Sequence, residues 1–97
     1  MQLVFHPRVY SDIDKIMERY ERAATRQLAD EFYAELRQCM AGAAKNPKRF
    51  AVRERDIRRA NLERFPFHFL FRIVGETVRV LVVRHHRRDP SFGMSRR

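Results

Sequence analysis

Hydrophobic positions in the first half of the chain follow one short extended run and then two helical repeats. Residues 2–6 predict a strand that stops at Pro7, and proline suits the first turn of a helix because its missing N–H needs no partner there. A helix over about 7–22 follows from apolar residues at helical spacing: Val9, Ile13, Ile16, Met17 and Tyr20. A second helix, from near Ala24-Thr25 to Asn46-Pro47, has its own stripe: Leu28, Phe32, Leu36, Cys39, Met40 and Ala43. Together they predict a helical hairpin.

From residue 57 the helical spacing gives way to strand patterns. Residues 57–62 predict a short strand, broken at Phe65-Pro66 because proline cannot donate to a sheet ladder. Residues 67–73 and 77–85 alternate apolar and polar positions, and Gly75-Glu76 between them fits a two-residue hairpin turn with glycine in the first central place. The face expected to cover the helices carries Phe67, Phe69, Phe71, Ile73, Val78, Val80 and Val82.

Counting outward from this turn predicts the register of the hairpin. Facing the helices, Val74 pairs with Thr77, Ile73 with Val78, Phe71 with Val80 and Phe69 with Val82. On the reverse face, Arg72 lies opposite Arg79, Leu70 opposite Leu81 and His68 opposite Val83. Two arginines directly opposite each other repel, which indicates either an anion or acidic group between them or two solvated side chains. The reverse face is expected to be a basic, partly apolar platform.

The order of elements predicts an α+β fold: a strand, a helical hairpin, then a three-stranded antiparallel meander, with both helices on one face of the sheet. The length of 97 residues fits one domain over 1–97, in which residues 87–97 form a basic tail that is either ordered or folds on a partner. No run approaches the roughly 20 apolar residues of a membrane span, no signal peptide is evident, and Cys39 has no partner for a disulfide. We therefore expect a cytoplasmic protein without membrane association, with Cys39 a buried or incidental thiol.

Charge is unevenly distributed along the chain. The net charge is +9, and residues 1–45 are balanced while residues 46–97 hold fourteen Lys/Arg against five Asp/Glu. A field of one sign attracts polyanions, and arginine suits bidentate contacts to phosphate or carboxylate. A nucleic acid, an acidic protein partner and a merely solvated surface all fit this charge.

No motif indicates a metal or cofactor site. The three glycines form no phosphate loop, no Cys/His cluster has zinc spacing, and His85-His86 should point to opposite faces of a strand. A metal-free attack on RNA remains possible, because the ribose hydroxyl is then the nucleophile and the protein supplies a base, an acid and cations. His68 titrates in the right range for this role, although a strand histidine beside arginines also fits binding or structure.

Several short segments, in this order and spacing, resemble the RelE/ParE superfamily of toxins from bacterial type II toxin–antitoxin modules. They are Phe5-His6-Pro7, Asp12-Ile13, Phe32 to Leu36, Asn46 to Phe50, Ile57-Arg58-Arg59, Arg64 to Phe67, Phe71-Arg72 and Val83 to Pro90. The resemblance runs nearly end to end, and it implies the same fold as the pattern above.

The resemblance implies one of two activities. RelE-like members cut mRNA on the ribosome, and carrying their site over to this chain assigns the catalytic roles to Arg59, His68, His86 and Arg87. The tyrosine expected near the end of that site is missing, and Phe92 lies near its place. ParE-like members poison DNA gyrase, and the segments 64–67 and 86–90 favour this "plasmid stabilisation" branch.

We therefore expect a ParE-like toxin that inhibits growth by binding a macromolecular target, DNA gyrase. The alternatives are a ribosome-dependent mRNA endoribonuclease and a plain nucleic-acid-binding module. The resemblance also implies a cognate antitoxin, with an amphipathic segment along the helical hairpin or the sheet edge, and possible higher-order complexes. No cofactor or metal is expected, and the arginines expected to converge on the target-binding or nucleic-acid-binding surface are Arg58, Arg59, Arg72, Arg79, Arg84, Arg87 and Arg88.

Overall fold

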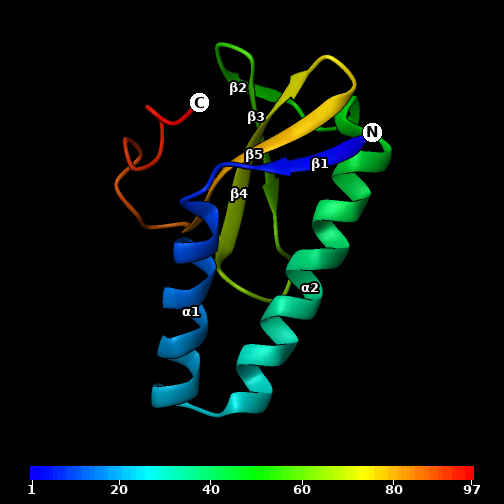
Figure 1. Cartoon of the computed structure of the whole chain (residues 1–97). Helices are drawn as coiled ribbons and strands as arrows, with labels where there is room; N and C mark the ends of the chain where they lie inside the picture. The colour runs from blue at the N-terminus through cyan, green and yellow to red at the C-terminus, as the bar shows by residue number, and fades with distance from the viewer.

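The two apolar repeats form a helical hairpin of α1 (Val9–Ala23) and α2 (Arg26–Lys45). Thr25 begins α2 as its N-cap, with its hydroxyl accepting a hydrogen bond from the Leu28 amide at 3.0 Å, which satisfies one of the free amides at a helix start. Pro47 prevents α2 from continuing and opens the short 3₁₀ helix η1 (Pro47–Arg49). In the computed structural model, which describes residues 1–97, both helices lie on one face of the sheet and diverge toward β1 (Figure 1).

The sheet has five strands in the order β1-β5-β4-β3-β2. Their bounds are β1 (Gln2–Phe5), β2 (Val52–Glu54), β3 (Ile57–Asn61), β4 (Phe67–Val74) and β5 (Thr77–His85). β1 pairs in parallel with β5, and the other neighbours are antiparallel. The predicted α+β class, with a β3-β4-β5 meander under a helical hairpin, is confirmed. β2 was not predicted, because its three residues are all exposed and leave no apolar alternation.

The register of the β4–β5 hairpin is as predicted near the turn. Val74 faces Thr77, Ile73 faces Val78, Arg72 faces Arg79 and Phe71 faces Val80. Gly75 has a φ of +58°, a conformation that glycine adopts without steric cost. The two residues between the strands are therefore sufficient to predict the local pairing.

Further from the turn the predicted register is wrong, because β5 contains an irregularity next to Leu81. Leu70 faces Val82, and Phe69 faces Val83. His68 consequently faces Arg84 instead of Val83. One extra residue in a strand turns every later side chain to the opposite face of the sheet.

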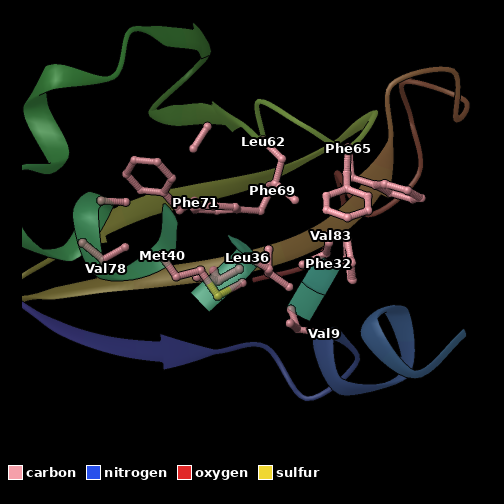
Figure 2. Close-up of a cluster of buried hydrophobic side chains, with 14 residues drawn as sticks. Val9, Phe32, Leu36, Met40, Leu62, Phe65, Phe69, Phe71, Val78 and Val83 are labelled. Atoms are coloured by element: carbon pink, nitrogen blue, oxygen red, sulfur yellow. The ribbon is translucent and has the colours of Figure 1, made fainter. Parts of the chain in front are cut away.

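The main hydrophobic core lies between the sheet and the helices (Figure 2). It includes one residue of α1, four of α2 and the inward faces of β4 and β5: Val9, Phe32, Leu36, Met40, Ala43, Phe67, Phe69, Phe71, Val78, Val80 and Val83. Aromatic rings pack edge to face within it, as between Phe32 and Phe67, with ring centroids 5.3 Å apart. Because of the irregularity, Val83 occupies this core in place of the predicted Val82.

A second, smaller cluster lies on the other face of the sheet, formed by Ile57, Leu70, Leu81 and Val82. Phe92 and Met94, from the tail, pack against it. A Cβ built on Gly93 would lie only 2.6 Å from Val82 Cβ, so the backbone of the tail rests directly on the strand. The apolar part of the predicted platform is therefore covered by the chain itself.

A buried ion pair anchors the tail to α1. Arg96 donates to both carboxylate oxygens of Asp12, at 2.6 and 3.1 Å, and to the Leu81 carbonyl at 3.0 Å. Asp12 also accepts a hydrogen bond from the Val83 amide at 3.1 Å. Val83 lies past Val80, the last residue of β5 that pairs with β1, so β1 does not bond this amide. One carboxylate thus joins α1, β5 and the tail.

Neither helix has a stretch long and apolar enough to cross a bilayer.

Candidate functional site

The face of the sheet that turns away from the helices has three zones along its length. At one end lie Arg72 and Arg79, and in the middle lies the small apolar cluster under the tail. At the other end, four side chains from three neighbouring segments meet: Arg59 of β3, His68 of β4, and Arg84 and His86 at the end of β5. We refer to these four residues as the histidine–arginine cluster.

The facing arginines of the first zone are accommodated by acceptors of the chain itself. Arg72 Nε donates to Asp56 Oδ2 at 2.9 Å, and Arg79 Nε donates to the main-chain carbonyl of Arg97. The pair with Arg72 lowers the pKa of the Asp56 carboxyl. An acidic group therefore offsets the repulsion between the strands, one of the two possibilities that the sequence left open.

Hydrogen bonds determine the tautomers in the histidine–arginine cluster. Arg84 Nε donates to His68 Nε2 at 2.9 Å, so Nε2 holds the lone pair and neutral His68 carries its hydrogen on Nδ1. That N–H faces His86 Nδ1 at 3.0 Å, with the two ring planes 10° apart and the centroids 5.2 Å apart. This is the geometry of a hydrogen bond in the ring plane. His86 Nδ1 is thus an acceptor, and neutral His86 carries its own hydrogen on Nε2.

His68 is buried and stays neutral. The residue is 1% exposed, and burial, followed by the charges of Arg59 and Arg84, lowers its pKa to about 3. The sequence predicted that His68 lies on the outer face of the sheet and titrates near neutrality. The ring does lie on that face, but the expected titration is wrong, because burial and the charges of Arg59 and Arg84 lower its pKa. His86 is exposed, but partial burial and Arg59 also lower its pKa.

The cations of the cluster have no carboxylate partner. Arg59 donates to Asn61 Oδ1 at 2.8 Å and approaches His86 Nδ1 at 3.3 Å, whereas Arg84 donates to the carbonyls of Pro90 and Phe92. All four ion pairs of the molecule lie elsewhere. Burial lowers the pKa of both guanidinium groups, and a further lowering comes from Arg53 at Arg59 and from Arg59 at Arg84, whereas the Asp89 carboxylate acts in the opposite direction on the pKa of Arg84.

The remaining predicted site residues lie apart from this cluster. Arg87 is exposed, and only its main-chain amide takes part in a hydrogen bond, to His85 Nδ1. Arg88 stacks on the Phe92 ring at 3.9 Å, and Arg58 donates to the Phe50 carbonyl at 2.6 Å. The structure therefore brings together Arg59, His68 and His86 of the four candidate catalytic residues, and leaves out Arg87.

An apolar groove, which sequence reasoning missed, lies where α1 and α2 diverge next to β1. Its volume is about 700 Å³, and most of its lining is hydrophobic: Leu3, Phe5, Val9, Tyr10, Ile13, Asp14, Met17, Tyr33, Leu36, Arg37, Met40 and Ala41. Tyr10 and Tyr33 are 60% and 40% exposed, so the groove has an accessible aromatic rim. One signal in the sequence was available: Tyr10 and Tyr33 lie three residues before Ile13 and Leu36, so each aromatic ring extends the apolar stripe of its helix by one turn.

Comparisons with known proteins agree with this architecture. The family model described as the ParE toxin of the type II toxin–antitoxin system parDE matches residues 3–90. A chain in a solved structure, the chromosomal ParDE toxin–antitoxin system from P. aeruginosa, has 22% sequence identity and a TM-score of 0.78. The match covers 88% of this chain and 95% of that chain, and at this identity it shows a shared fold. A search of curated proteins found no significant match.

Proposed function

Because the chain belongs to the ParE family of toxins from type II toxin–antitoxin systems, we propose that it inhibits growth by binding DNA gyrase and that a cognate antitoxin neutralises it. The family match over residues 3–90 carries this proposal. The RelE-like alternative would require a group that transfers protons in the histidine–arginine cluster.

The state of His68 argues against this residue as the general acid or base of a ribonuclease. A general acid or base works best with a pKa near the operating pH. At a pKa of about 3, roughly one imidazole in ten thousand is protonated at pH 7, and the residue is 1% exposed. His68 is therefore a structural support for His86, and the inhibition we propose needs no RNA cleavage.

The apolar groove supports an antitoxin of a particular kind. An amphipathic helix binds a hydrophobic groove through apolar residues spaced three or four apart. The exposed rings of Tyr10 and Tyr33 offer aromatic contacts of the type that dominate such interfaces, and Asp14 and Arg37 supply polar contacts in the same lining. We infer that a helical segment of the antitoxin occupies this groove.

The target is tested by inducing the protein in its native host while mapping mRNA ends and the DNA-damage response. We expect growth arrest with a damage response that gyrase resistance suppresses, and inhibition of supercoiling by purified gyrase. Cleavage within translated codons, without a damage response, would favour the ribonuclease instead. Harmless overproduction would remove the basis for any toxin.

The antitoxin groove is tested with Tyr10→Ala and Tyr33→Ala. Loss of a central aromatic contact at an interface weakens binding by roughly tenfold or more, so each variant should stay toxic but escape neutralisation at antitoxin levels that silence the wild type. Val52→Ala is the matched control, since Val52 is 47% exposed on β2, outside the groove. Equal neutralisation of all three variants would exclude the groove as the docking site.

A further inference from the structure

The exposed rim of the histidine–arginine cluster presents hydrogen-bond donors that the protein itself does not use. A guanidinium group has five N–H donors, and the hydrogen bonds of Arg59 to Asn61 and His86 occupy two of them. His86, which is exposed, uses Nδ1 as an acceptor and therefore has its Nε2–H free. Two donor groups, one planar and cationic, are thus held next to each other.

Buried groups hold these donors in position. His68 fixes the His86 ring by the hydrogen bond between their Nδ1 atoms, and Arg84 fixes His68 from the other side. Arg84 is itself held by two carbonyls of the tail, at 2.8 Å each. A site whose supporting residues are fixed in this way loses little conformational entropy when a ligand binds.

The electrostatic surroundings favour an anion. No carboxylate forms an ion pair with the cluster, and Arg53 on β2 is exposed and adds positive charge close to Arg59. Partly buried cations that repel one another are stabilised by any anion that enters between them.

We propose that Arg59 and His86 form a phosphodiester-binding site through which this protein contacts the backbone of a nucleic acid directly. The planar fork of arginine and an imidazole N–H match two non-bridging oxygens of one phosphate, and Arg53 extends the positive charge toward a neighbouring phosphate. This inference goes beyond the gyrase proposal and does not depend on it.

A nucleic acid fits this site better than an acidic peptide does. The hydrophobic surface that a folded or helical peptide requires lies in the groove between the helices and β1, lined by other residues. The small apolar cluster beside the histidine–arginine cluster is covered by Phe92 and Met94. What remains accessible is polar and positively charged, and contacts of that kind account for most binding to a nucleic-acid backbone.

The test uses the full chain and fluorescence anisotropy with a short labelled DNA duplex, over a series of salt concentrations, and a single-stranded RNA of equal length as a second probe. The double variant Arg59→Gln/His86→Gln should bind roughly tenfold more weakly, and its log Kd against log salt slope should fall by about 1 because one phosphate contact is lost. The matched control is Arg26→Gln, an exposed arginine in the first turn of α2. Arg59→Lys keeps the charge without the fork and should fall between the double variant and the wild type.

Several results would overturn the proposal. Wild-type binding by the double variant, or an equal loss in Arg26→Gln, would mean that total charge and not this site binds the duplex. Tighter binding of a labelled acidic peptide, with the same sensitivity to Arg59→Gln, would assign the site to an acidic protein. Gyrase inhibition measured on the same preparations tests the other proposal separately, since loss of DNA binding with retained gyrase inhibition, or the reverse, distinguishes the two.

Discussion

Gly93 is the position where the tail comes closest to the sheet, and Gly93→Ala tests whether that contact holds the tail in place. A Cβ at this position would lie 2.6 Å from Val82 Cβ and 2.7 and 3.0 Å from its two methyl carbons. Val82 is fully buried, so it cannot move aside. Gly93 also has a φ of +83°, which an alanine adopts only with strain.

The expected cost combines these two effects. Alanine in a left-handed conformation costs about 1 kcal/mol, and an extra carbon forced into a packed site costs about 1–3 kcal/mol more. We therefore expect the free energy of unfolding to fall by roughly 2–4 kcal/mol, and for a domain of this size that lowers Tm by about 10 °C or more. If the tail detaches instead, the cost is limited to the contacts that Phe92, Met94 and Arg96 lose.

Urea denaturation measures the total cost, and hydrogen exchange locates it. The Met94 and Arg96 amides, which donate to the Ser91 and Gly93 carbonyls, should lose protection before the strands do. Gly75→Ala is the matched control, since Gly75 has a φ of +58° and a Cβ added there would have no neighbour within 4 Å. This substitution should lower the free energy of unfolding by only about 1 kcal/mol, the cost of alanine in a left-handed conformation. Equal destabilisation by the two substitutions would refute the close contact between tail and sheet.

Two further predictions concern buried polar groups. Asp12→Asn breaks the ion pair with Arg96, whose side chain is only 8% exposed, and should lower the free energy of unfolding by roughly 3 kcal/mol. The exposed Asp14→Asn should cost less than about 0.5 kcal/mol, so similar denaturation midpoints for the two would contradict the structure. The pKa of His68 is about 3 in the folded chain against 6.5 when unperturbed, so only the unfolded state takes up a proton as the pH falls below 6.5. Stability should then decline by up to about 1.4 kcal/mol per pH unit between pH 6.5 and 3, and His68→Gln, compared by denaturation at pH 7 and 5, should remove most of that decline.

Much of the fold was predictable because it follows from local chain patterns. The spacing of Val9, Ile13 and Tyr20 predicted α1, and Gly75 with the alternating flanks predicted the β4–β5 hairpin. The irregularity next to Leu81 was not predictable, because nothing in the run of apolar residues from Val80 to Val83 distinguishes the extra one. Which of them faces the helices depends on packing against β4 and the tail.

The candidate site was predictable in composition and not in arrangement. The resemblance to RelE-like nucleases selected Arg59, His68 and His86, and the fold does bring these three side chains together. The sequence could not show that His68 would be buried and neutral, because its pKa depends on burial in the folded chain and then on the charges of Arg59 and Arg84 from neighbouring strands. The groove could not be predicted, because its lining residues have the helical spacing of ordinary core positions, and only the divergence of α1 and α2 leaves them accessible.

Residue order was enough to predict the helices, four of the five strands, the family resemblance and the excess of positive charge in the second half. Periodicity, turn chemistry and composition are properties of neighbouring residues, so they can be read along the chain. Which arginines are free to bind a partner became clear only from the folded arrangement. Arg72 forms an ion pair with Asp56 and Arg96 forms one with Asp12, whereas Arg59 forms none. Ion pairs depend on distances through space, which the order of residues does not specify.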